Sequence, residues 1–302
     1  MDGLEPLVNL AASALRLAAP LILAAMAGIL SFKVGLINIA LEGLMLIGAF
    51  VGVVVGAAAG SALVGLLVAC IAAALVAAAF ALFVTDLRAN LIVAGLAINI
   101  LAAGATAYLL QVVVGVRGIY APDTLDAITA VQLPILSDLP LAGKALFSFT
   151  PLVYLSWIAV PLTWLFLYRT PAGKHIRAVG ENQDAARTAG ISVRKMQYLA
   201  LILGGVLCGL AGASLSLGDL GLFRENMVSG RGFIALAAVY FASGRPGLTT
   251  LACLVFGTFS ALQFRLQTTS SIPVQFFQML PYIIVVAMLT LISYRKEWRK
   301  GW

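Results

Sequence analysis

Residues 62–84 read ALVGLLVACIAAALVAAAFALFV, a continuous apolar stretch without a charged side chain. A helix rises 1.5 Å per residue and the hydrocarbon core of a bilayer is about 30 Å thick, so about 20 apolar residues are needed to cross it. The stretch is long enough and leaves no polar face for water. It therefore predicts a transmembrane helix.

The rest of the chain has a similar composition. Its 302 residues are 62% hydrophobic and 10% charged, with a mean hydropathy of +1.05, whereas a soluble domain carries roughly 25% charged residues. So few charges could not cover a water-facing surface, which excludes a large soluble helical core. The apolar runs are also continuous, unlike the alternating ~10-residue strands of a membrane barrel. We therefore expect an all-α, multi-pass membrane protein.

Eight further stretches resemble the first, so the chain is expected to hold about nine transmembrane helices. The candidate spans are 12–32, 36–56, 62–84, 91–114, 149–168, 197–218, 229–243, 248–264 and 276–294. The seventh and eighth are short for full crossings, which indicates broken or tilted segments.

The basic residues between the spans predict the orientation. If the segments 31–35, 85–90, 169–196, 243–247 and the C-terminal tail face the cytoplasm, that side holds 13 of the 19 lysines and arginines. Cytoplasmic loops carry the excess of basic residues in membrane proteins. We therefore expect the N-terminus outside and the C-terminus in the cytoplasm. The net charge of +7 is explained by this rule, and no nucleic-acid partner is expected.

Two similar segments indicate an internal repeat. NIALEGLMLIGAF (38–50) and FIALAAVYFASG (233–244) each follow a glycine-containing break. With nine crossings, spans 6–9 would run opposite to spans 1–4, and inverted repeats of this kind are a transporter architecture with the substrate path at their interface. Chance similarity of two apolar helices is the alternative. We expect a single permease domain, 1–302, made of a first repeat (1–114), an outer loop (115–148), a connector span (149–168), a cytoplasmic segment (169–196), and a second repeat with a basic tail (197–302).

Polar residues inside the apolar spans are candidates for the substrate path. Glu42 is the one carboxylate deep in a span, and a charge at mid-bilayer costs ~2.5–3.5 kcal/mol on insertion scales. Asn38 and Met45 lie at helical spacing from it and predict one shared face turned into the protein. Asn99 lies deep in the fourth span. Either these residues line the path, or Glu42 holds unwound backbone near Gly35.

The sequence contains no catalytic set. The phosphate-loop pattern GxxxxGK[ST] is missing, as are H-E-x-x-H and G-x-S-x-G. The lone His175 has no metal-ligand spacing around it. We therefore expect no enzyme activity, no metal and no cofactor in this chain, so ATP and Mg²⁺ would be bound by a partner ATPase.

The cytoplasmic segment contains a candidate docking element. Residues 184–190 read DAARTAG, with an acid that favours a helix start, two alanines and a glycine suited to ending the helix. A solvated loop is one interpretation. A short helix whose small residues seat in a groove of another protein is the other.

This segment resembles a known family. The pattern Asp184-Ala185-Ala186 followed by Gly190 is similar to the cytoplasmic loop of ABC importer permeases. IRAVGENQDAARTAGI (176–191) resembles the ribose, nucleoside and branched-chain amino acid permease family. GLINIALEGLMLIGAF (35–50) and PILSDLPLAGKALF (134–147) resemble its nucleoside and simple-sugar branch.

The resemblance implies partners and roles. It implies an ATP-binding cassette ATPase, a second homologous permease chain and an extracytoplasmic lipoprotein receptor, with this chain embedded in the lipids of the bacterial inner membrane. The residues expected to form the coupling contact with the ATPase are Arg177, Glu181, Asn182, Asp184, Ala185, Ala186 and Gly190. Gln183 stands where a proline is common in the family, so helix entry is expected to differ.

The function expected from these features is a permease subunit of an ATP-driven importer for nucleosides or related simple sugars, working by alternating access. The path residues would be Asn38, Glu42, Met45 and Asn99. The alternatives are a secondary transporter or facilitator that acts alone, which inverted repeats suit equally, and a membrane scaffold without transport.

Overall fold

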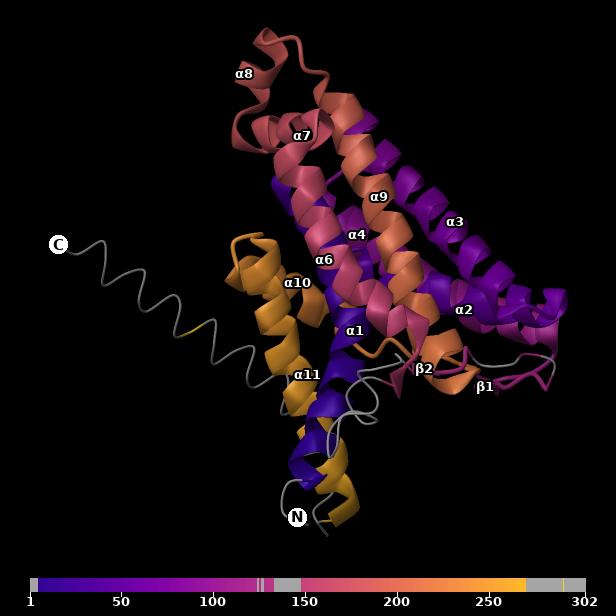
Figure 1. Cartoon of the computed structure of the whole chain (residues 1–302). Coiled ribbons are helices and arrows are strands. Elements are labelled where there is room, and N and C mark those ends of the chain that lie inside the picture. The colour runs from indigo at the N-terminus through magenta and orange to yellow at the C-terminus, as the bar shows by residue number, and fades with distance from the viewer. Residues whose placement is uncertain (1–4, 124, 126–127, 133–147, 270–289, 291–302) are drawn as a thin grey trace.

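The computed structural model describes residues 5–123, 125, 128–132, 148–269 and 290, which form a bundle of helices (Figure 1). The α-helices are α1 (Glu5–Lys33), α2 (Leu41–Ala59), α3 (Ala62–Ala81), α4 (Leu91–Leu109), α6 (Pro151–Arg169), α7 (Pro171–Glu181), α8 (Gln183–Thr188), α9 (Val193–Ala213), α10 (Arg231–Phe241) and α11 (Pro246–Thr269). Helices α3, α4 and α9 continue directly into wider π-helical turns, which are η1 (Leu82–Asp86), η2 (Leu110–Val114) and η3 (Ser214–Leu220).

Two pairs of very short strands complete the described structure. The strands are β1 (Ile119–Tyr120), β2 (Val131–Gln132), β3 (Ser148–Phe149) and β4 (Phe223–Arg224). β1 pairs with β4 and β2 pairs with β3, both antiparallel. The β1–β4 pair ties the loop after the fourth span to the segment after α9.

Within the described residues, seven helical segments are long and apolar enough to cross a membrane. They correspond to the first six predicted spans and the eighth. The seventh predicted span, 229–243, contains α10, which has only 11 residues and is too short to cross alone. The ninth, 276–294, lies outside the described residues except for residue 290.

Helix α1 forms the centre of the bundle. It packs against α6, α9, α10 and α11, and from Ala18 to Leu30 its apolar side chains are almost completely buried. A helix that is apolar around its whole circumference is stable only when it is covered on all sides. Helix α1 is covered by protein, so its hydrophobicity reflects the core as well as the membrane.

Glycines allow α2, α3 and α9 to pack closely. A Cβ atom at Gly48 would lie 2.8 Å from the Cα of Gly209 on α9, and one at Gly65 on α3 would lie 2.9 Å from the Cα of Gly56. Real Cβ contacts are not this short, so glycine is required on these faces. The four-residue spacing of glycines along α2 predicts such contacts, and the prediction is confirmed at Gly48 and Gly56. Gly60 instead ends α2 in the left-handed conformation.

Helix α3 lies at the edge of the bundle and presents a lipid-compatible face. Its buried positions, Ala69, Ala73 and Ala77 among them, recur every fourth residue. The large apolar residues of the opposite face are more than half exposed; these are Leu63, Leu67, Ile71 and Leu75. An apolar patch of this length on a protein surface requires an apolar surrounding, which the bilayer supplies.

The two ends of the bundle differ. Helices α7 and α8 lie together at one end, and the strand pairs lie toward the opposite end, as does the beginning of α1 (Figure 1). The described part of the predicted outer loop is tied to the second half of the chain, since Ile128 donates a hydrogen bond to the Leu217 carbonyl at 3.1 Å. Residues 133–147 of that loop lie outside the described residues.

Candidate transport and coupling sites

The chain between α1 and α2 is irregular, and its residues alternate between buried and more exposed positions. Residues 34–40 turn sharply, with Gly35 in the left-handed conformation at φ +83°. Asn38 lies in this segment and is 1% exposed. Its Oδ1 accepts a hydrogen bond from the Ala40 amide at 3.1 Å, while its Nδ2 has no hydrogen-bond partner among the described residues. A buried amide group that leaves a donor unused is uncommon.

Asn99 of α4 holds the start of α2 in place. Its Nδ2 donates to the Ile39 carbonyl at 2.9 Å and its Oδ1 accepts from the Gly43 amide at 2.8 Å. The amides of the first turn of a helix have no partner within the helix, and the N-cap Ala40 supplies no side-chain acceptor. Asn99 therefore caps α2 from a neighbouring helix.

Glu42 performs the same task for α10. Its two carboxylate oxygens accept hydrogen bonds from the amides of Gly230 and Gly232, each at 2.7 Å. These amides stand at the N-terminus of α10, where the helix dipole favours a negative charge. A Cβ at Gly232 would lie 2.6 Å from the Glu42 amide nitrogen, so only glycine allows this approach. Glu42 therefore connects α2 to a helix that starts 189 residues later in the chain.

The predicted polar face is partly confirmed. Glu42 and Met45 are 8% and 0% exposed, so this face of α2 does look into the protein. Asn38, however, precedes the helix, because α2 begins at Leu41 rather than at residue 36. Glu42 holds backbone at the α10 entry rather than near Gly35. The structure brings Asn38, Glu42 and Asn99 to one junction, with Met45 one turn farther along α2.

Helix α7 is fixed against the membrane helices. It starts at a Thr170 N-cap whose Oγ1 accepts from the Gly173 amide at 3.1 Å, followed by Pro171 in the first turn. Arg177 turns back onto α6, where its Nε donates to the Leu167 carbonyl at 3.1 Å and its guanidinium lies 4.6 Å from the Tyr168 ring centroid. Arg177 therefore holds α7 rather than presenting a free charge.

Helix α8 confirms the short helix predicted around 184–190. Asn182 caps it, since its Oδ1 accepts from the amides of Asp184 and Ala185, both at 3.0 Å. Gly190 ends it in the left-handed conformation at φ +78°, as glycine commonly does after a helix. Ala186 is buried at 4% exposed, whereas Ala185 is exposed. The expected coupling residues from Asn182 to Gly190 thus form one capped helical element, and Glu181 lies exposed at the end of α7.

Several residues of these sites are not evident from the sequence. The pairing of Glu42 with Gly230 and Gly232 joins distant segments, and no local pattern indicates it. A second connection joins Asp86, Arg194 and Tyr198: the Arg194 Nε lies 2.7 Å from Asp86 Oδ1, and the Tyr198 hydroxyl donates to Asp86 Oδ2 at 2.6 Å. Helix α7, in contrast, has a readable signal in Thr170–Pro171, an N-cap followed by proline at the first helical position.

Comparison with known proteins decides the family. The model of the branched-chain amino acid transport system permease component matches residues 10–289. The chain belongs to this permease family. The resemblance seen in its sequence is thus confirmed. The permease is a membrane-spanning subunit of a transporter in the inner membrane and not an enzyme, and ATP hydrolysis resides in a separate subunit. It works with an ATPase and a substrate-binding protein.

Three relatives align over most of the permease. The guanosine ABC transporter permease protein of Bacillus subtilis is 36% identical, covering 96% of this chain and 93% of the relative. The nucleoside ABC transporter permease protein of Lactococcus lactis is 33% identical over 96% and 94%. The glucose ABC transporter permease protein of Haloferax volcanii is 30% identical over 94% and 77%. No solved structure matches.

Proposed function

We propose that the permease imports nucleosides, driven by ATP hydrolysis in its partner. The observation that carries this proposal is the near full-length similarity to permeases named for guanosine and nucleosides, at 36% and 33% identity. A putative glucose permease of Haloferax volcanii is also 33% identical, over 83% of this chain, and a second glucose permease is 30% identical, so simple sugars are the second substrate class. Both classes carry several hydroxyl groups, which amide side chains can bind.

The full architecture that we propose has nine crossings in two inverted repeats, with the N-terminus outside. The placement of α7 and α8 at the end opposite the start of α1 (Figure 1) supports this orientation, because the segment that holds them is rich in lysine and arginine. The pairing of α2 with α10 supports the repeats, since both helices are capped at their N-termini by a side chain from another helix. A second permease chain and an outer lipoprotein receptor would complete the assembly.

We propose α8 as the element that receives force from the ATPase. It is capped at both ends, by Asn182 and Gly190, so it can move as a unit. Ala185 is exposed and small, and can sit in a groove of the partner. Ala186, by contrast, is buried and packs α8 against the rest of the permease. Arg177 would transmit the movement of α8 to the membrane helices, because it holds α7 on α6. Asp184 and Glu181 would make charged contacts at the edge of the interface with the ATPase.

The path is proposed to run past the α2–α10 junction. Glu42 and Asn99 use both of their side-chain polar atoms on backbone partners, so their role is to hold the two helix ends that border the path. The Asn38 Nδ2 at this junction has no hydrogen-bond partner in the described part of the chain. It is therefore the group available to a substrate hydroxyl when the helices separate. Met45 would form the apolar wall one turn away.

The test is uptake of radiolabelled guanosine by proteoliposomes that contain this chain, the second permease chain, the ATPase and the receptor, with ATP inside or outside the vesicles. The expected result is uptake that needs ATP on the α8 side and is reduced by unlabelled nucleosides but not by glucose. If glucose reduces the uptake and unlabelled nucleosides do not, the substrate would be a simple sugar instead. Uptake by this chain without the ATPase would contradict the importer and favour a facilitator.

A further inference from the structure

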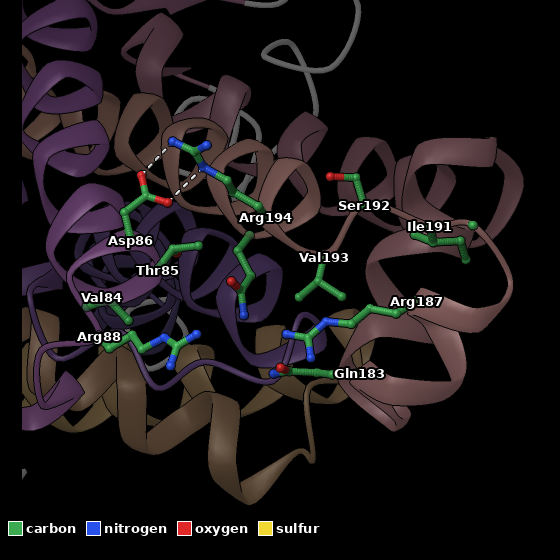
Figure 2. A pocket seen from close by; sticks show the side chains of 12 residues that line it. Val84, Thr85, Asp86, Arg88, Gln183, Arg187, Ile191, Ser192, Val193 and Arg194 are labelled. Atoms are coloured by element: carbon green, nitrogen blue, oxygen red, sulfur yellow. Dashed lines mark hydrogen bonds and ion pairs between the residues drawn. The ribbon is translucent and has the colours of Figure 1, made fainter.

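A polar cavity lies between the end of η1, helix α8 and the start of α9. It has a volume of about 580 Å³ and is lined by residues from η1, the following loop, α8 and the start of α9. Figure 2 shows its side chains. The basic residues of the lining are Arg88, Arg187 and Arg194, and its one acidic residue is Asp86. No aromatic side chain of the described residues lines it.

The carboxylate of this cavity is already occupied. Asp86 receives the Arg194 guanidinium at 2.7 and 2.8 Å, through Nε and Nη2, and also the Tyr198 hydroxyl at 2.6 Å. Bidentate pairing of this kind uses both carboxylate oxygens. Asp86 and Arg194 therefore neutralise each other and leave the other two arginines without a partner in the cavity wall.

Those two arginines face one another. Figure 2 shows the guanidinium groups of Arg88 and Arg187 directed into the cavity from opposite walls. Arg88 makes no ion pair or hydrogen bond to any residue that the structure describes. Arg187 makes a single contact with Asp184 at 3.3 Å, and that carboxylate is 91% exposed, so water screens the pair strongly. Water also weakens the repulsion between Arg88 and Arg187, since both side chains are exposed, and an anion between them would convert what remains into attraction.

The backbone at Arg88 is also unusual. Its φ of +51° is a left-handed conformation that a residue other than glycine adopts rarely and at some cost. Such conformations persist only when the surroundings enforce them, and they cluster at binding sites. The amides of Leu87 and Ala89 donate hydrogen bonds to carbonyls of η1 and hold the turn. They thereby fix the direction in which the Arg88 side chain projects from the backbone.

We propose that this cavity binds a phosphate group between Arg88 and Arg187. A phosphate monoester carries about −1.5 to −2 charge at pH 7, which matches the charge of the unpaired Arg88 and of Arg187, whose only ion pair is the exposed one with Asp184. Arginine forms bidentate hydrogen bonds with phosphate oxygens. Gln183 also lines the cavity, and its amide adds a neutral donor. Because no aromatic ring is present to stack on a base, the site recognises the phosphate and not the group it is attached to.

Two sources could supply that phosphate. One is a soluble phosphate ester, for which the cavity volume is sufficient. The other is the headgroup of an anionic lipid, because the exposed apolar side chains of Leu82, Phe83 and Leu87 place the lipid boundary beside the cavity. In either case the bound anion would join α8 to the loop between α3 and α4, and so stabilise the position of α8.

The test is protection of individual arginines from phenylglyoxal, read by peptide mass spectrometry. The full chain is placed in nanodiscs of phosphatidylcholine, without the ATPase, and titrated with inorganic phosphate or with adenosine monophosphate at constant ionic strength. Arg88 and Arg187 should be protected, whereas Arg169, which is exposed outside the cavity, should not. In Arg88→Gln the midpoint for protecting Arg187 should rise about tenfold, equivalent to about 1.4 kcal/mol. Lys195→Gln removes an exposed charge that does not line the cavity and should leave the midpoint unchanged.

Nanodiscs with added phosphatidic acid distinguish the sources. Protection by the lipid but not by soluble phosphate would still support a phosphate site and assign it to a headgroup. Equal protection of Arg169, or no protection in either arm, would overturn the proposal. A final arm adds the ATPase alone. Protection of both arginines by the ATPase, with none from either phosphate source, would assign the cavity to a protein contact and would also overturn the proposal.

Discussion

Replacing Glu42 by glutamine tests the connection between α2 and α10. The carboxylate accepts two backbone hydrogen bonds of 2.7 Å in a site that is 8% exposed. Hydrogen bonds to charged groups contribute about 1.5–3 kcal/mol each. Glutamine keeps one acceptor oxygen, now uncharged, and turns an NH₂ group toward the other amide. We therefore expect Glu42→Gln to lower the free energy of unfolding by about 2–4 kcal/mol.

The assay is thermal unfolding of the purified permease, followed by the loss of its monodisperse chromatographic peak. A destabilisation of this size corresponds to a fall in Tm of about 4–8 °C. Glu225→Gln is the matched control, because Glu225 accepts one backbone hydrogen bond, from Gly118 at 2.8 Å, and its Tm should fall by about 2 °C or less. Nucleoside uptake should fall in Glu42→Gln even at temperatures where the protein stays folded. A Tm within about 1 °C of the wild type would refute the capping role.

Three further predictions concern single residues. Ala185→Arg places bulk on the exposed side of α8, so ATP hydrolysis stimulated by the receptor should be lost while Tm stays unchanged; normal stimulation would count against the coupling role. Asn182→Ala removes the cap of α8 and should lower stimulated ATP hydrolysis, because loss of an N-cap costs about 1 kcal/mol. Asn182→Asp keeps a capping side chain and should keep the stimulated hydrolysis; equal activity of the two variants would argue against the capping role. Gly232→Ala forces a Cβ within 2.6–2.8 Å of Glu42 and should lower Tm at least as much as Glu42→Gln, whereas Gly247→Ala, where nothing lies within 4 Å, should not.

The sequence predicted the membrane helices well because a bilayer imposes one simple requirement, a long apolar helix. Residues 62–84 illustrate this, since α3 with η1 covers the same stretch. Helix α8 was also predictable, because its end depends on the local conformational freedom of Gly190. The spacing of glycines along α2 likewise predicted its contacts, since small residues recurring every four positions leave little other role on a helix face.

The start of α2 could not be placed from composition. Most of residues 36–40 are as apolar as the helix that follows, but the segment is irregular, and Asn99 of another helix donates a hydrogen bond to its Ile39 carbonyl, which stabilises it. The α10 entry depends in the same way on Glu42, which is remote in the chain. Such pairings are set by tertiary packing, and a single sequence carries no local signal for them. The cavity between Arg88 and Arg187 likewise depends on tertiary packing, because its two arginines come from distant parts of the chain.

The accessibility of residue 185 to a labelling reagent tests most directly whether α8 lies in the cytoplasm and is bound by the ATPase. Ala185→Cys can be labelled with a membrane-impermeant maleimide, against a background of native cysteines that lie in membrane helices. We expect no labelling in intact cells, rapid labelling in inverted vesicles stripped of the ATPase, and protection when the ATPase is added back. Labelling from outside intact cells, or labelling in inverted vesicles that the ATPase does not slow, would contradict this expectation.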